Sequence, residues 1–146
     1  MTKGFSLLEL TVALAIAALV LVMVVPSSSR RYGAVELQGS ARDVAAALRL
    51  TRSRAITANR EAEFALDVAK AVYRPAGAGA SVSLPRGVRV ALFTADDELL
   101  SGTAGAIRFF PDGSSSGGGV ALSRDGVRYD VLVDWLTGGV SVHERP

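Results

Sequence analysis

The feature that most constrains this chain is an apolar run from Phe5 to Val25, in which Glu9 is the single charged side chain. About 21 residues in a helix that rises 1.5 Å per residue span roughly 31 Å, close to the thickness of a bilayer's hydrocarbon core. We therefore predict a membrane-spanning helix over residues 5–26. An ionised carboxylate costs about 2.5 to 3.5 kcal/mol near the bilayer centre and less near its edge, so Glu9 needs a partner.

A free α-amine is the nearest candidate partner for this carboxylate. A peptidase that cut between Gly4 and Phe5 would place a positive charge about one helical turn from Glu9, on the same chain or on a neighbouring subunit. An ordinary signal peptide, cut at a small-residue site such as Ala13-Leu14-Ala15, is an alternative, as is a plain single-pass anchor. The acid inside the core and the length of the run favour the processed helix.

These N-terminal residues resemble a known processing signal. A short basic leader, Met1-Thr2-Lys3-Gly4, followed by Phe5 and by Glu9 within an apolar helix, is similar to the prepilin signature of type IV pilins and type II secretion pseudopilins. The resemblance implies that a prepilin peptidase removes residues 1–4 and methylates Phe5. It also implies that Glu9 neutralises a terminal amine during subunit assembly, and that the N-terminus is cytoplasmic.

The segment after Pro26 has the pattern of an amphipathic helix. Apolar residues recur every three or four positions, at Leu37, Ala41, Val44 or Ala45, Leu48 and Ala55. This spacing places them on one helical face. We predict one helix from Phe5 to Asn59, kinked at Pro26 because proline removes a hydrogen-bond donor, with residues 27–60 as an amphipathic continuation packed on a sheet.

Charge is distributed unevenly along the chain. Seven arginines between Arg30 and Arg60 give that segment a net charge of +5, whereas residues 61–146 carry −3. A basic helix can bind nucleic acid or acidic lipid headgroups, but a solvated outer face is the favoured interpretation. Because cysteine is absent, disulfides, thiolate metal sites and cysteine nucleophiles are excluded.

From Glu61 onward the pattern changes to alternating residues with turn signals, which predicts about seven short strands. The expected strands cover residues 63–68, 72–73, 88–93, 106–110, 120–123, 129–135 and 140–142. Asp125-Gly126 is a strong signal for a two-residue hairpin turn. We predict an α+β domain over residues 61–146, with an antiparallel sheet covered on one face by the helix.

Two further segments limit the resemblance to one group of pilin-like proteins. Phe109 to Gly118 (FFPDGSSSGG) before one strand and Asp134 to Gly138 (DWLTG) before the last strand are similar to the H-type minor pseudopilins of type II secretion and to FimT-like minor pilins. The likeness covers most of the chain, except about residues 76–105. It implies a type IV pilin-like fold and a place in the tip complex of a periplasmic pseudopilus.

Residues that could carry chemistry are few and do not converge. His143 lies three residues from the end of the chain, where a solvated position is expected. The loop from Ser114 to Gly119 lacks the Gly-Lys-Ser/Thr ending of a phosphate-binding loop, so a flexible hairpin connection is expected. Asp96, Asp97 and Glu98 offer oxygen donors without calcium-loop spacing, so an acidic surface loop is expected.

The sequence therefore predicts a non-enzymatic assembly subunit without a cofactor or a metal. The resemblance implies as partners the other major and minor pseudopilins, the prepilin peptidase and the inner-membrane assembly platform. It implies a single-pass inner-membrane location before assembly and a pseudopilus location afterwards. The alternative is a FimT-like minor pilin in pilus assembly or DNA uptake, which the acidic distal segment disfavours because DNA capture needs a basic patch.

Overall fold

A computed structural model describes residues 6–93, 99–101 and 104–145, with side chains described for all of these except 22–32 and 99–101. The chain divides into two compact units, Met1–Gly33 and Ala34–Pro146. One helix, α1 (Leu7–Ala58), contributes to both units. The secondary structure is helical through Pro26, while the predicted kink stays a prediction.

Both ends of α1 have local signals that sequence chemistry explains. At the start, the Oγ of Ser6 accepts a hydrogen bond from the N–H of Glu9 at 3.2 Å, which is an N-cap. At the end, Asn59 adopts a left-handed φ of 48°. The N–H of Arg60 donates to the carbonyl of Ala55 at 3.2 Å, so this carbonyl is satisfied where the helix stops.

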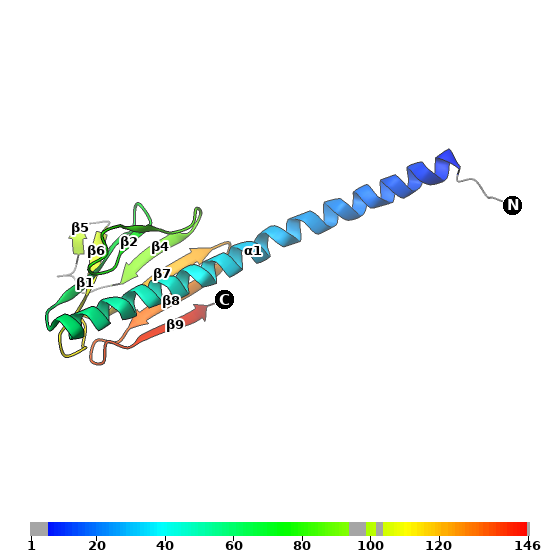
Figure 1. Ribbon diagram of the computed structural model, residues 1–146. Helices are drawn as coiled ribbons and strands as arrows, with labels where there is room; N and C mark the ends of the chain where they lie inside the picture. Colours follow the sequence, from blue (N-terminus) through cyan, green and yellow to red (C-terminus); the bar gives the residue numbers. More distant parts are fainter. Residues whose placement is uncertain (1–5, 94–98, 102–103, 146) are drawn as a thin grey trace. The chain divides into compact units, whose positions relative to one another are not determined.

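The second unit contains two antiparallel sheets, which Figure 1 shows beside the C-terminal part of α1. The first sheet has the strand order β3-β2-β1-β6-β5, with β1 (Ala62–Asp67), β2 (Val72–Arg74), β3 (Val82–Ser83), β5 (Leu99–Ser101) and β6 (Ala104–Phe109). The second has the order β4-β7-β8-β9, with β4 (Arg89–Phe93), β7 (Gly118–Arg124), β8 (Val127–Val133) and β9 (Val140–Arg145).

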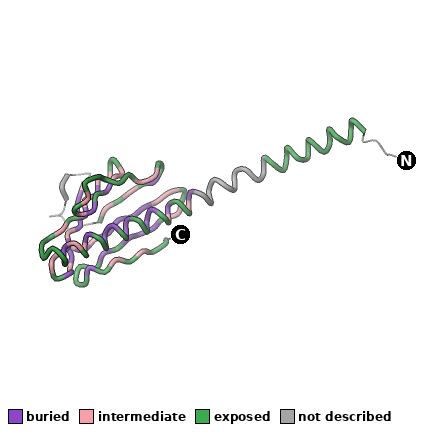
Figure 2. The backbone as a smooth tube through the Cα atoms, viewed as in Figure 1, coloured by how far each residue is buried: buried purple, intermediate pink, exposed green. Residues whose placement is uncertain are grey.

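The predicted helical face is the face that packs on the sheets. The positions named for it are fully buried, namely Leu37, Ala41, Val44, Ala45, Leu48 and Ala55. Figure 2 shows burial alternating with exposure along this part of α1. Thr51 lies on the same face, fully buried, and its hydroxyl donates to the carbonyl of Ala47 at 2.8 Å, so that its polar group is satisfied.

The prediction of about seven strands in one sheet is corrected in two respects. Nine strands are found in the described residues, and they form two sheets. The prediction missed β3 and β5, which are too short to show an alternating pattern. It also treated the loop from Ser114 to Gly119 as a hairpin connection, whereas β6 and β7 belong to different sheets.

The hairpin predicted at Asp125-Gly126 is confirmed. β7 pairs with β8 up to the couple Arg124 and Val127, so the turn contains two residues. Asp125 and Gly126 have φ values of 52° and 86°. Left-handed φ at both central residues is the feature of a type I′ turn, whose twist matches that of paired strands.

One apolar cluster joins the helix to both sheets. Phe64 and Phe109 come from the first sheet, Leu122 and Val131 from the second, and all are fully buried against the α1 face. The rings of Phe64 and Tyr73 stack with centroids 5.5 Å apart. Burial also raises the pKa of the Tyr73 hydroxyl, with a smaller contribution from the Asp43 charge. The core of the second unit therefore depends on all three layers at once.

We expect Phe64→Ala to lower the free energy of unfolding by about 3 to 5 kcal/mol, because it removes a fully buried ring and leaves a cavity. Guanidinium unfolding of the full chain in detergent micelles measures this through the fluorescence of the single tryptophan. Val82→Ala, at an exposed position of β3, is the control and should change stability by less than about 0.5 kcal/mol. Equal stabilities for the two variants would contradict the described core.

Candidate functional site

The two segments that carried the resemblance in the second unit lie against each other. The N–H of Ser115 donates to the carbonyl of Trp135 at 2.9 Å, and the Ser115 hydroxyl donates to the carbonyl of Asp134 at 3.0 Å. A Cβ added to Gly117 would lie 3.1 Å from the Cβ of Trp135. We call this pair of segments, residues 109–118 and 134–138, the paired loops.

The turn at Asp134 is closed by its own side chain. The Asp134 carboxylate accepts hydrogen bonds from the N–H and the hydroxyl of Thr137, both at 2.8 Å. The N–H of Gly138 donates to the Asp134 carbonyl at 2.8 Å. The two Thr137 bonds, first of all the one from the N–H, hold the pKa of the Asp134 carboxyl below its ordinary value. The charged form therefore stabilises the turn.

In the first of the paired loops, an aspartate side chain also accepts hydrogen bonds from a residue further along the turn. The Asp112 carboxylate accepts hydrogen bonds from the Ser114 hydroxyl at 2.6 Å and from the Ser114 N–H at 2.9 Å. These bonds lower the pKa of Asp112. Ser116 adds a third connection, since its hydroxyl accepts from the N–H of Arg108 at 3.1 Å. The flexible connection expected here is in fact a hydrogen-bonded crossover between sheets.

Arginines of α1 bind the paired loops from the helix side. The Arg52 Nε donates to the carbonyl of Gly113 at 2.8 Å, and Arg49 donates to the carbonyl of Val140, just after the second loop, at 2.9 Å. A Cβ on Gly138 would lie 2.1 Å from the Gly113 oxygen, so only glycine fits there. The prediction of a solvated outer face does not hold for Arg52, which is half-buried.

The turn presents large apolar side chains to solvent. Trp135 is 66% exposed and Leu136 is 64% exposed, although the backbone around them is fixed by the bonds given above. Sequence reasoning placed Asp134 and Trp135 at the end of a strand over residues 129–135, but β8 ends at Val133 and both residues lie in the turn. The signal available to it was an isolated tryptophan inside a turn that is closed by aspartate, threonine and glycine.

Glu9 lies in the first turn of α1 and is exposed. Its N–H contacts both the hydroxyl and the carbonyl of Ser6. Ser6-Leu7-Leu8-Glu9 matches the sequence pattern of a capping box, Ser-x-x-Glu, and the serine half of that box is formed by the bond from the Glu9 N–H to the Ser6 Oγ. Sequence reasoning did not note this pattern. Gly4 and Phe5, which flank the predicted cleavage, lie outside the described residues.

Apolar side chains surround Glu9 in the first unit, where Leu7 is 83% exposed and Leu8, Leu14 and Leu21 are also exposed. Across the part of the chain that the structure describes, no helix combines the length and apolarity needed to cross a membrane. The span predicted over residues 5–26 stays a prediction, since Phe5 and the side chains from 22 to 26 lie outside that description.

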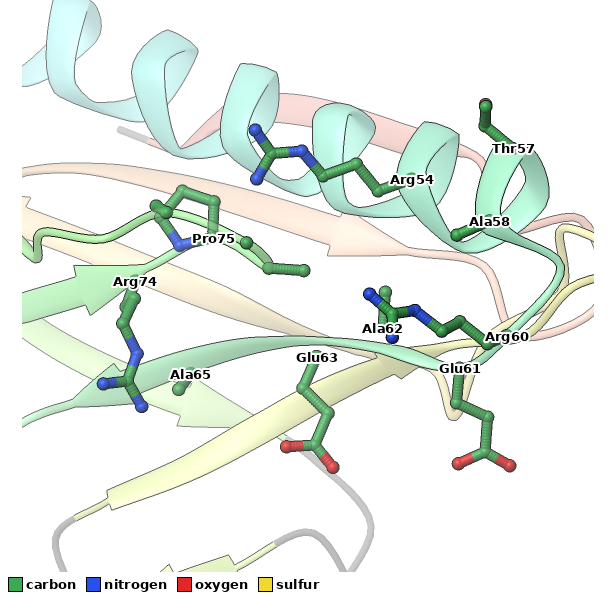
Figure 3. Close-up of a pocket in the computed structure, with 13 residues that line it drawn as sticks. Arg54, Thr57, Ala58, Arg60, Glu61, Ala62, Glu63, Ala65, Arg74 and Pro75 are labelled. Carbon is green, nitrogen blue, oxygen red and sulfur yellow. The ribbon is translucent and has the colours of Figure 1, made fainter.

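A hollow of about 590 Å³ lies between the end of α1 and the strands β1 and β2. Figure 3 shows Arg54 extending from the helix above Pro75, while Glu61 and Glu63 project from the other side of β1. Both glutamates form ion pairs with Arg108. Thr57 is the one hydroxyl side chain among the described lining residues, and the two carboxylates of this lining are paired with Arg108 instead of with Thr57.

The other residues considered for chemistry in the sequence analysis do not join either of these sites in the described part of the chain. His143 lies on β9, exposed, with its Nε2 at 3.1 Å from the Ser141 hydroxyl. It contributes to neither the paired loops nor the hollow beside α1. Asp96, Asp97 and Glu98, weighed as a calcium loop, lie outside the described residues.

Comparisons with known proteins agree with this geometry. The family model for the type II transport protein GspH matches residues 40–138, which include the paired loops. The type II secretion system protein H of Xanthomonas campestris pv. campestris is 32% identical over 138 residues, covering 94% of this chain and 81% of the relative. The minor pseudopilin EpsH from the type 2 secretion system of Vibrio cholerae has a similar fold, with a TM-score of 0.57 at 13% identity over 74% of this chain and 96% of that one.

The capped N-terminal helix and the antiparallel sheets on its C-terminal half define the chain as pilin-like. The match over residues 40–138, together with the 32% identical relative, identifies it further. The chain belongs to the GspH family of type II transport proteins. The resemblance to H-type pseudopilins is thereby confirmed, and secretion is favoured over the FimT-like alternative.

We expect Asp134→Asn to lower the melting temperature at neutral pH. The folded-state pKa of Asp134 lies below its ordinary value of 3.8, so its contribution is present above that value and is lost as pH falls through the folded-state pKa. The gap to wild type should therefore close on acidification. Thermal unfolding followed by circular dichroism, between pH 7 and about pH 2, measures it.

Asp125→Asn is the matched control, because Asn-Gly supports the same type I′ turn as Asp-Gly. This variant should melt close to wild type at neutral pH. A gap for Asp134→Asn that persists at the lowest pH would show that the amide disturbs the turn through geometry and not through loss of charge.

Proposed function

We propose that this GspH-family chain acts as a minor pseudopilin, a non-enzymatic subunit that joins the other pseudopilins in the tip of the type II secretion pseudopilus. The fibre would serve the export of folded proteins across the outer membrane. The observation that carries this proposal is an exposed carboxylate, Glu9, in the first turn of an apolar helical segment. The family membership of the chain supports it.

The first unit needs an apolar environment that one chain cannot supply. Its described large apolar side chains between Leu7 and Leu21 are exposed, and each costs about 1.5 to 3 kcal/mol when it stays in water instead of being fully buried. We propose that lipid covers this helix before assembly, with residues 5–26 as a single-pass anchor, and that neighbouring helices cover it in the fibre. The second unit is then periplasmic.

Cleavage and methylation of the N-terminus would supply the partner of Glu9. We propose that the prepilin peptidase removes residues 1–4, so that Phe5 carries the new, methylated amine. In a fibre, Glu9 of one subunit meets the Phe5 amine of another, and the low dielectric strengthens the pair while making an unpaired carboxylate costly. Assembly in the correct register is thereby favoured over slipped packing.

The Ser-x-x-Glu pattern offers the Glu9 side chain a second role, support of the helix start, which an experiment must separate from the ion pair. Glutamine replaces glutamate in a capping box, but it carries no charge. We expect Glu9→Gln and Glu9→Leu both to reduce recovery of the subunit with sheared pseudopili by about tenfold or more, the change that about 1.4 kcal/mol produces. Quantitative immunoblotting against the total membrane pool measures this.

Glu9→Asp, which keeps the charge on a shorter side chain, is the matched control and should retain more incorporation than Glu9→Gln. Wild-type incorporation of Glu9→Gln together with loss for Glu9→Leu would assign Glu9 to helix capping alone. The ion pair would then be abandoned.

We expect the mature protein to begin at Phe5 with a methyl group on its amine. Intact-mass spectrometry of the subunit from membranes should show loss of residues 1–4 and a gain of about 14 Da for one methyl group. Gly4→Leu should block the cut. A mature mass that still includes Met1 would overturn the processing step.

A further inference from the structure

The sheet formed by β4, β7, β8 and β9 has a second face, directed away from the core. Along β8, Tyr129, Val131 and Val133 are buried in the apolar cluster. Because side chains alternate along a strand, Asp130 and Leu132 lie on the opposite face. We call this opposite side the outer face.

An apolar row crosses the outer face. Phe93 pairs with Gly119, and Gly119 pairs with Leu132, so the three residues lie side by side across β4, β7 and β8. A Cβ on Gly119 would lie 2.9 Å from the Cδ2 of Leu132, which shows that the leucine side chain leans over the glycine. Phe93 is 46% exposed and Leu132 is 37% exposed.

This row ends at the paired loops. A hollow of about 580 Å³ is lined by residues that include Leu132, Trp135 and Ser141 together with Gly117 and Gly118. Trp135 is therefore continuous with the apolar row, and its backbone is held by the Ser115 bonds. An exposed tryptophan on a hydrogen-bonded backbone beside a hollow has the properties of a binding hot spot, since the backbone loses little conformational entropy on contact.

Beside the apolar row the outer face carries excess positive charge. The side chain of Asp130 is only 4% exposed and accepts from the Nε of Arg128 at 2.7 Å and from the Nε of Arg145 at 2.8 Å. The Arg128 guanidinium also lies 5.7 Å from the centre of the Phe93 ring. One carboxylate between two guanidinium groups leaves one positive charge unneutralised. The exposed Arg89 adds a further positive charge, because it lies across the sheet from Arg128, with Ser123 between them.

We propose that the outer face, from Phe93 through Leu132 to Trp135, docks another pseudopilin of the same system, through a surface segment that has an apolar side chain flanked by carboxylates. The apolar side chain would enter the hollow beside Trp135, and the carboxylates would meet the surplus charge at Arg89, Arg128 and Arg145. This inference rests on the proposed assembly role and adds to it a contact between soluble domains, separate from Glu9.

Nucleic acid is the other occupant that arginine and aromatic side chains together could attract. The net charge of −3 over residues 61–146 disfavours binding of nucleic acid, and Asp130 already neutralises part of the charge of Arg128 and Arg145. A phosphate backbone also leaves the hollow beside Trp135 without an apolar occupant. The geometry therefore favours a protein segment.

The test titrates the full chain in detergent micelles with each of the other pseudopilins of its system, purified in the same detergent, by isothermal titration calorimetry. One partner should bind, with an affinity that falls as salt rises through about 0.1 M. Trp135→Ala and Leu132→Ser should each weaken binding by about tenfold or more, and Arg89→Glu by about threefold or more. Val82→Ala, exposed on the other sheet, should leave the affinity within about twofold.

Each outcome decides the proposal. Binding to none of the pseudopilins would overturn it, as would unchanged affinity for both Trp135→Ala and Leu132→Ser in variants whose melting confirms folding. Tighter Trp135-dependent binding of a single-stranded oligonucleotide than of any pseudopilin would also overturn it. Glu9→Leu should bind like wild type here, so a failure of the outer face is distinguishable from a failure of the Glu9 pairing.

Discussion

The structure of the second unit depends on one constraint, the burial of the apolar face of α1 from Leu37 to Ala55. Neither sheet alone covers this face, because the cluster that surrounds it draws Phe64 from the first sheet and Val131 from the second. Two small sheets that would be marginal separately are thereby joined into one core. The paired loops are fixed at the end of this arrangement, where Arg52 of the helix binds Gly113.

Much of this architecture could be predicted because it follows from local periodicity. The spacing of three to four residues identified the buried helical face, and Asp125-Gly126 identified a turn that requires two left-handed residues. The division into two sheets could not be predicted, since it depends on where the strand after the 109–118 segment pairs. Nothing in the local pattern distinguishes a crossover from a hairpin, and β3 and β5 are too short to have a period.

The two candidate sites also differ in whether the sequence alone could identify them. Glu9 was identifiable from sequence because a single charge in an apolar run is a physical anomaly, although the bond between its N–H and the Ser6 hydroxyl emerged only with the structure. The outer face was not identifiable, because Phe93, Leu132 and Trp135 are far apart in sequence and meet only through strand register. Long-range pairing of this kind has no local signature, and the same applies to the bond between Arg52 and Gly113.

The helix contacts of the second unit also determine how it responds to mechanical load. In the second unit, α1 is held over several turns, from Leu37 to Ala55, and Arg49 and Arg52 bind carbonyls near its C-terminal end. Force along the axis of α1 loads these contacts together, in shear, whereas a perpendicular force would peel them apart one turn at a time. Forced unfolding follows the rate of barrier crossing and not equilibrium stability, so we expect this domain to resist a force along α1 longer than an equal force across it.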